Sequence, residues 1–307
     1  MRLLGRLPSL RLRGLMVAAL AVSLCACGGE VNVSVPPRIA VLSAFPAEMA
    51  PLLAQTTVDD TTTINGRSFR IGKLGGVSVV IGLTGIGLVN AATTTHALLE
   101  QFALTGVVVS AVAGSTVQIG DVTVPATWEF TDGTSYTATP AWLDLAKTIA
   151  ASGAVLLDSC TQRPSAPALP QVCVTQNLAI AVGGIGQSTD PNGGKPFQCQ
   201  SSGTDVLRCN VGANDIDSTS TVSGPAGAAL DTIDAATVIV SDNETAAIAR
   251  EAAARGLPFI AFRAVSDGTG DPLWLPGYPS QFFVYYRLAA HNAAAAAVAF
   301  LERLAGR

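Results

Sequence analysis

Short apolar runs alternate with longer Ala-rich runs along the chain from residue 38 onward. The short runs are rich in Val and Ile and predict buried strands, while the longer runs predict helices. The predicted strands are Arg38–Ser43, Arg70–Lys73, Val77–Leu83, Gly106–Val112, Asp121–Ala126, Leu178–Val182, Thr237–Ser241 and Pro258–Val265. One predicted helix begins at Glu48, and the others cover Leu88–Phe102, Ala141–Ser152, Glu244–Arg255 and Gln281–Leu304. This alternation predicts a three-layer α/β/α fold with a central mixed, mostly parallel sheet.

The stretch 159–220 interrupts this pattern. It is rich in Ser, Gly, Pro, Asn and Asp. A structureless loop of that length is unusual in a compact domain. We therefore expect an insertion within a domain that spans residues 38–307, interrupted by the strand Leu178–Val182.

The N-terminus has the pattern of an export signal. Arginines at positions 2, 6, 11 and 13 precede the apolar run Gly14–Leu24, which is too short to cross a membrane. The following Leu24–Gly28 (LCACG) resembles a bacterial lipobox, although Cys25 is unusual there. We expect a signal peptide over residues 1–27, with lipidation of Cys27, and a tether over residues 28–37. The mature protein would be lipid-anchored on the periplasmic side of a bacterial membrane. The alternative is that the N-terminus is cleaved as an ordinary secretory signal.

The charge balance excludes nucleic acid as a partner. The chain has 18 basic and 22 acidic residues, and the four arginines of the signal would be lost on cleavage. Nucleic-acid binding needs a basic face, which such a chain does not offer.

Four cysteines remain beyond the signal, at positions 160, 173, 199 and 209. An even number in an exported chain favours disulfides. The pairs Cys160–Cys173 and Cys199–Cys209 close the shortest loops and are our prediction among the three connectivities. No Cys-x-x-Cys pair is present, so we expect disulfides and not a metal site.

Three carboxylates follow predicted strands. Glu48 comes after the first strand, Glu244 after Thr237–Ser241, and Asp267 directly after Pro258–Val265. Ligands of open α/β sheets collect beyond the carboxyl ends of strands, so these side chains are candidates for one site. Glu48 and Glu244 could instead complement helix N-termini, and Asp267 could be a turn residue.

Arg263 interrupts an apolar strand, and a buried guanidinium must be paired. Asp242 and Glu244 are its nearest candidate partners in the sequence.

Six short motifs occur in a characteristic order. They are IAVLSAFPAE (39–48), TGIGLVNAA (84–92), VSAVAGS (109–115), VQIGDVTV (117–124), DNETAAIA (242–249) and FRAVSD (262–267). Together they resemble the methylthioadenosine/S-adenosylhomocysteine nucleosidases of the nucleoside phosphorylase superfamily. The resemblance runs from Arg38 to about Leu301 and skips most of 159–220.

The resemblance implies hydrolysis of the N-glycosidic bond of a purine nucleoside or 5′-thio analogue, without a cofactor or a metal. By this resemblance, Glu48 is the general base that activates water, Glu244 binds the ribose hydroxyls, and Asp267 protonates the leaving base. It also implies a homodimer, and a substrate pocket that includes the following residues: Val112, Gly114, Asn243, Ser266, Phe282 and Tyr285. For Phe282 and Tyr285, packing in the helix core is the alternative.

Some positions depart from the family pattern. Asn243 stands in place of a Met under the ribose, and Val112 in place of a small polar residue near the sugar. The loops Ser43–Ala47 and Gly114–Gln118 have no Arg or Lys to hold phosphate, which favours a hydrolase over a phosphorylase. The run Val122–Trp128 is similar to exported storage-like relatives, so a non-catalytic nucleoside-binding protein is the alternative function.

Overall fold

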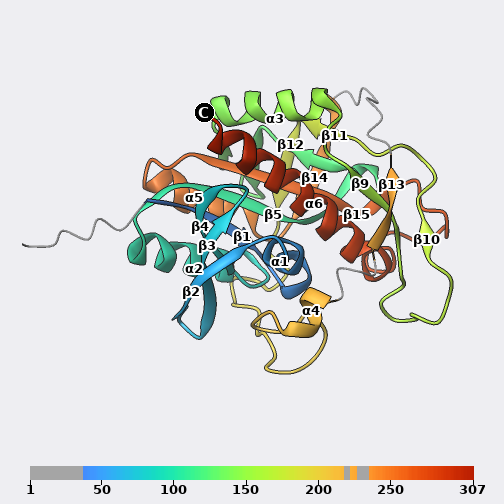
Figure 1. Ribbon diagram of the computed structural model, residues 1–307, viewed down its shortest axis with the longest axis horizontal. Helices are drawn as coiled ribbons and strands as arrows, with labels where there is room; N and C mark the ends of the chain where they lie inside the picture. The colour runs from blue at the N-terminus through green and yellow to red at the C-terminus, as the bar shows by residue number, and fades with distance from the viewer. Residues whose placement is uncertain (1–36, 218–221, 227–234) are drawn as a thin grey trace, which may run out of the picture. The chain divides into compact units, whose positions relative to one another are not determined.

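The computed structural model describes residues 37–217, 222–226 and 235–307 (Figure 1). The helices are α1 (Pro46–Leu53), α2 (Leu88–Gln101), α3 (Pro140–Ser152), α4 (Ala213–Asp217), α5 (Thr245–Ala254) and α6 (Phe282–Ala305), with a 3₁₀ turn at Ala235–Thr237. The strands are β1 (Arg38–Ser43), β2 (Thr57–Ile64), β3 (Arg67–Leu74), β4 (Val77–Leu83), β5 (Leu104–Gln118), β6 (Val122–Val124), β7 (Thr127–Phe130), β8 (Ser135–Thr137), β9 (Leu157–Thr161), β10 (Val172–Cys173), β11 (Ile180–Val182), β12 (Ile185–Ser188), β13 (Val222–Ala226), β14 (Ile239–Asp242) and β15 (Phe259–Thr269). The predicted signal, with Cys27, and the tether up to residue 36 lie outside the described residues.

The large sheet is mixed, with parallel strands at its centre. β1 lies between β4 and β5 and runs parallel to both, and β15 runs parallel to β5. β14 joins the far end of β5 in the antiparallel sense, through the pair Ser241 and Gly114. The central strands are apolar on both sides because helices cover both faces of the sheet.

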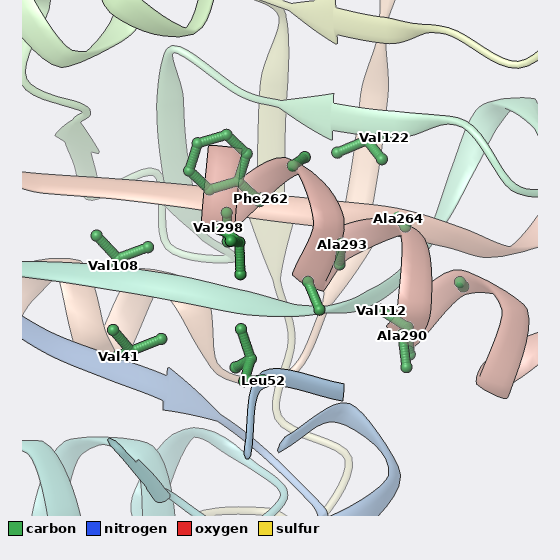
Figure 2. Packing of buried hydrophobic residues seen from close by; sticks show 14 of the residues in the cluster. Val41, Leu52, Val108, Val112, Val122, Phe262, Ala264, Ala290, Ala293 and Val298 are labelled. Carbon is green, nitrogen blue, oxygen red and sulfur yellow. The ribbon is translucent and has the colours of Figure 1, made fainter. Parts of the chain in front are cut away.

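Two helical layers enclose this sheet (Figure 1). Helices α1, α3 and α6 bury one set of side chains, in which Val108 and Phe262 from the sheet pack against Ala293 and Val298 of α6 (Figure 2). Helices α2 and α5 cover the opposite face, around Val109 and Ala247. The Ala-rich surface of α6 allows that helix to lie close to β5 and β15. The predicted three-layer fold is confirmed.

Two disulfides staple the polar part of the chain. Cys160 and Cys173 face each other across the β9–β10 pair, in a small antiparallel sheet of β10, β9 and β13. Cys199 and Cys209 close a separate loop. The predicted local pairing is therefore confirmed.

Strand β12 was not predicted, and it lies within the expected insertion. It runs parallel to both β7 and β14 in the large sheet, as β11 does to β6, so two parts of 159–220 belong to the main domain. Its sequence, IGQS, has few residues of high strand propensity, because Gly186 lies beside Trp128 of β7. A Cβ at Gly186 would lie 2.4 Å from the Trp128 ring, so a residue of low strand propensity is required here.

Within the described ranges, no helix combines the length and apolar character needed to span a bilayer.

Candidate active site

A cavity of about 560 Å³ lies where β1 and β14 end and where β15 shifts its register against β5. Predicted site residues that line it are Glu48, Val112, Gly114, Asn243, Glu244, Ser266, Asp267 and Phe282. Segments far apart in the sequence thus bring three carboxylates to one cavity. This is the position at which an α/β sheet binds its ligands.

Glu48 is held by the backbone around it. Its side chain is buried in the first turn of α1, and Oε2 accepts hydrogen bonds from the N–H groups of Ala44 at 2.6 Å and Phe45 at 3.3 Å. Oε1 accepts a bond from the N–H of Val112, at 2.8 Å. Burial raises the pKa of Glu48 to about 8, and the nearby Glu244 adds to the rise, while Arg263 opposes it. Glu48 can therefore exchange a proton near neutral pH.

Glu244 and Asp242 share one buried cation. The Nη2 atom of Arg263 lies 2.7 Å from Asp242 Oδ2 and 3.3 Å from Glu244 Oε2. Arg263 is only 1 % exposed, so this pairing compensates the burial of its charge. The prediction that Arg263 pairs with one of these carboxylates is confirmed, and the structure shows that it pairs with both.

The other oxygen of Glu244 is also anchored. Oε1 accepts a hydrogen bond from the N–H of Gly87, at 2.8 Å, at the start of α2. Burial raises the pKa of Glu244, and Arg263 counteracts that effect. Glu244 is thus fixed in orientation at the cavity wall, and a carboxylate has further lone pairs for two hydroxyl groups.

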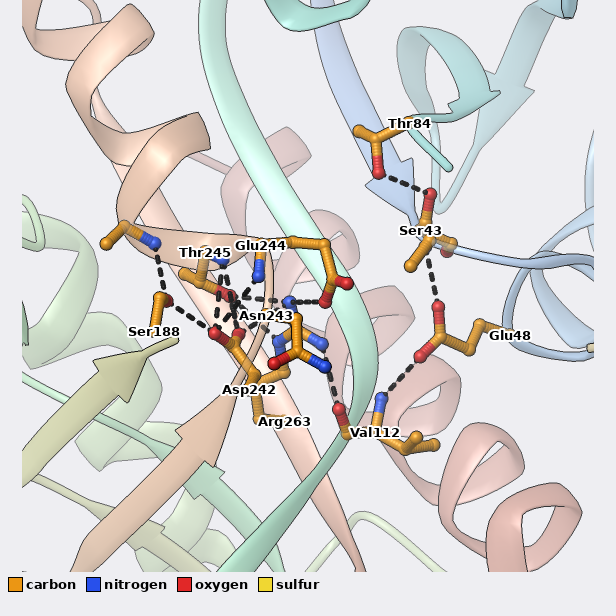
Figure 3. A network of polar contacts seen from close by, with 12 residues as sticks. Ser43, Glu48, Thr84, Val112, Ser188, Asp242, Asn243, Glu244, Thr245 and Arg263 are labelled. Atoms are coloured by element: carbon orange, nitrogen blue, oxygen red, sulfur yellow. Dashed lines mark hydrogen bonds and ion pairs between the residues drawn. The ribbon is translucent and has the colours of Figure 1, made fainter. Parts of the chain in front are cut away.

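Val112 connects the two networks (Figure 3). Its N–H donates to Glu48, and its carbonyl oxygen accepts a bond from Arg263 Nη1 at 2.8 Å. One residue of β5 therefore sets the relative position of Glu48 and of the ion pairs around Glu244. Val112 differs from the family pattern in its side chain, but both of these hydrogen bonds are made by its main chain.

Asp267 lies near the end of β15 and also lines the cavity. The Ser266 hydroxyl donates to Oδ1 at 2.7 Å, and burial raises the pKa of the Asp267 carboxyl. A Cβ at position 114 would lie 2.6 Å from Asp267 Oδ2. Gly114 is thus needed for the close approach of β5 to this carboxylate, which is partly buried and available to donate a proton when protonated.

Tyr285 is not brought to the cavity. Its ring is fully buried in the core between α6 and the sheet, and its hydroxyl donates to Asp271 at 2.5 Å. Phe282 is exposed to the cavity one turn earlier on the same helix. Tyr285 therefore packs in the core, as the alternative had it, whereas Phe282 lines the cavity.

The cavity also has an apolar wall that the sequence did not reveal. Its members are Phe45, Ile86, Phe197, Val206, Leu207, Tyr278 and Phe283. Phe197, Val206 and Leu207 come from the irregular segment that contains the Cys199–Cys209 disulfide. No periodicity marks them, because only the folded loop brings them to the cavity.

The described lining of the cavity contains no Lys or Arg. In the same described ranges, no cluster of three or more His, Cys, Asp or Glu side chains could hold a metal ion. The three carboxylates of the cavity can transfer protons and accept hydrogen bonds.

Comparison with known proteins agrees with this architecture. The family model of the phosphorylase superfamily matches residues 38–175. An uncharacterised protein of Mycobacterium tuberculosis is 33% identical over 230 residues, which cover 65% of this chain and 89% of that protein. A 5′-methylthioadenosine/S-adenosylhomocysteine nucleosidase of Shewanella denitrificans is 27% identical over 274 residues, covering 87% of this chain and 100% of the relative.

Solved structures show the same fold. The nucleosidase of that name from Neisseria meningitidis, in complex with methylthio-immucillin-A, superposes with a TM-score of 0.58 at 20% identity and covers 87% of this chain and 100% of its own. Futalosine hydrolase of Helicobacter pylori superposes with a TM-score of 0.57 at 17% identity, covering 87% of this chain and 98% of its own. With these matches and the motifs placed around one cavity, the chain belongs to the nucleoside phosphorylase and nucleosidase superfamily.

Proposed function

We propose that this protein hydrolyses the N-glycosidic bond of a purine nucleoside, including nucleosides with a 5′-thio substituent. The observation that carries the proposal is the placement of Glu48, Glu244 and Asp267 around one cavity, each in a different environment. A relative from Shewanella denitrificans and a structural neighbour from Neisseria meningitidis are 5′-methylthioadenosine/S-adenosylhomocysteine nucleosidases, which supports the same reaction class.

The three environments suit three different roles. Asp267 would protonate the base, because its raised pKa keeps a proton available for the leaving group. Glu48, with a pKa of about 8, would accept the proton of the attacking water. Glu244 would accept hydrogen bonds from the ribose hydroxyls, since both of its oxygens are oriented by protein donors.

The fixed donors around Glu48 also serve its role as a base. Three backbone N–H groups hold the carboxylate in one orientation, so no side-chain reorganisation is needed when it takes a proton. The developing positive charge on the sugar would face a cavity whose described ionisable lining groups are all acidic. Such a wall stabilises an oxocarbenium-like transition state.

Water suits this cavity better than phosphate as the nucleophile. A phosphate dianion needs cationic side chains or several free N–H donors. Arg263 contacts residues of the cavity wall, and it is already bound to Asp242, Glu244 and the carbonyl of Val112. It has little capacity left for an anionic substrate.

We extend the proposal to the location of the protein. The two disulfides between the four cysteines beyond the signal are typical of an oxidising compartment. Together with the basic and apolar leader and Cys27, they support export and lipid anchoring. Replacing Cys27 with Ser should release the protein from the membrane fraction, and unchanged fractionation would refute the lipid anchor.

The activity is tested by following free base from 5′-methylthioadenosine, S-adenosylhomocysteine, adenosine and inosine. The purified, oxidised protein is incubated with each nucleoside, with and without phosphate. Release that needs no phosphate supports a nucleosidase, and release only with phosphate would identify a phosphorylase. Saturable binding without any release would instead support the non-catalytic nucleoside-binding protein.

A further inference from the structure

The loop closed by Cys199–Cys209 forms part of the cavity wall. Its ends are 10 residues apart, and Val206 and Leu207, near its C-terminal end, line the cavity. Two backbone hydrogen bonds connect the two sides of the loop. The N–H of Gln200 donates to the Leu207 carbonyl at 2.8 Å, and the N–H of Cys209 donates to the Gln200 carbonyl at 3.1 Å. The disulfide and these hydrogen bonds therefore make the loop a compact unit.

Asp205 anchors this loop to the helices beside the site. Its carboxylate accepts bonds from the Tyr286 hydroxyl at 2.7 Å and from Arg287 Nε at 2.9 Å, and Asp205 is itself buried. Its carbonyl oxygen accepts the N–H of Ala47, at 2.9 Å. Ala47 precedes Glu48, so the loop touches α1 directly beside the proposed general base.

The anchor continues into the aromatic side of the cavity. Tyr286 stacks on Phe282 with ring centroids 5.4 Å apart, and it meets the edge of Phe45 at 6.3 Å. Phe45 and Phe282 both line the cavity. A displacement of Asp205 would therefore disturb Val206 and Leu207 directly, and Phe45 and Phe282 through Tyr286.

The loop and Asp267 both line the cavity, but Asp267 also lines the hollow beside it and the loop does not. A second hollow of about 410 Å³ adjoins the first, and it shares Gly114, Ser241, Asp267 and Tyr278 with it. None of the loop residues lines that second hollow. If the base lies against Asp267 and the ribose hydroxyls against Glu244, the group left to meet the loop is the substituent on the 5′ carbon.

We propose that the Cys199–Cys209 loop is the specificity element of this site, and that it selects nucleosides whose 5′ substituent is apolar. The proposal rests on the proposed function for the orientation of the nucleoside. Val206, Leu207 and Phe197 offer no charge or hydrogen-bonding side chain to a polar substituent. Asp205 and the disulfide are positioning groups, because they act through these apolar side chains and not on the reacting atoms.

The chain contains a matched control for the disulfide. Cys160–Cys173 also closes a short loop, with a separation of 13 residues, but it staples β9 to β10. None of residues 157–174 lines the cavity. Removing each disulfide in turn by paired Cys→Ser substitutions separates the effect on the site from a general loss of stability.

The experiment measures KM and kcat for 5′-methylthioadenosine and for adenosine, which lacks the apolar 5′ group. The full chain is compared with Leu207→Ala, with the Cys199→Ser/Cys209→Ser pair and with the Cys160→Ser/Cys173→Ser control. Leu207→Ala should raise KM for 5′-methylthioadenosine about tenfold relative to adenosine, as expected when apolar contact with a substituent is lost. The Cys199/Cys209 variant should lose the same preference, with kcat less affected than KM, and the control should retain it.

Dissociation constants of the same two nucleosides, measured by calorimetry, keep this test separate from that of the proposed function. If no base is released but the preference in binding depends on Leu207, the hydrolase fails and the loop proposal stands. An equal preference in the full chain, Leu207→Ala and the Cys199/Cys209 variant overturns the loop proposal. A full chain that does not discriminate between the two nucleosides, or binds neither, also overturns it.

Discussion

Replacing Arg263 with Met should destabilise the fold through the site itself. The guanidinium is 1 % exposed and lies 2.7 Å from Asp242 and 3.3 Å from Glu244. Met fills much of the same space but leaves two buried carboxylates without their cation. Breaking one side of a buried ion pair costs about 3–5 kcal/mol, so the free energy of unfolding should fall by that amount.

Arg255→Met is the matched control. Arg255 lies 3.5 Å from Glu100, and its side chain is 43% exposed, so water screens the interaction. An exposed pair of this kind contributes about 0–1 kcal/mol. Urea denaturation of the oxidised protein, followed by circular dichroism, measures both variants on one scale.

The loss should depend on pH. Arg263 opposes the effect of burial on Glu244, so without it the pKa of Glu244 in the folded state would rise further above its range in the unfolded chain, about 4.3. The folded variant then holds protons that the unfolded chain releases, so its stability falls as pH rises above that range. Two results would refute the pairing of Arg263 with Asp242 and Glu244. One is a loss of unfolding free energy equal to that of Arg255→Met. The other is a loss that does not grow between about pH 5 and pH 8.

Two further predictions concern the other carboxylates. Burial raises the pKa of Glu48 from 4.5 to about 8, so as pH rises this carboxyl ionises in the unfolded chain before it does in the folded protein. The free energy of unfolding should therefore fall with rising pH between these two pKa values, by up to about 1.4 kcal/mol per pH unit. Titration of stability in Glu48→Gln should show a flatter slope, and an identical slope would contradict the raised pKa. Gly114→Ala should displace the Asp267 carboxylate, 2.6 Å from the new Cβ, and lower kcat at least tenfold while the melting temperature changes by only a few degrees. Full activity in that variant would show that the position of Asp267 is not critical.

The sequence predicted the parts of the site that depend on strand ends. Glu48 and Glu244 follow strands of one sheet, and Asp267, which was expected just after a strand, lies near the end of β15. The topology of a mostly parallel sheet brings such positions together. The pairing of Arg263 was predictable for a similar reason, because a buried charge has few possible partners nearby in the chain.

The sequence could not predict which side chains complete the cavity. Phe197, Val206 and Leu207 lie in a polar segment whose position depends on the Asp205 contacts with α6, and these contacts join residues about 80 positions apart. Tyr285 and Phe282 are both aromatic and one helical turn apart, so only the packing of α6 on the sheet decides which of them faces the cavity. Strand β12 escaped prediction because its close approach to Trp128 requires Gly186.

The most direct test of the central claim is the rate of base release by Asp267→Asn at saturating nucleoside. Asn keeps the shape of Asp267 and can still pair with Ser266, but it cannot donate the proton to the leaving base. We expect kcat to fall by about 10²–10⁴-fold while the dissociation constant of the nucleoside changes only a few-fold. A variant that releases base at the rate of the unmodified protein would contradict the assignment of Asp267 as the general acid, and with it the proposed mechanism.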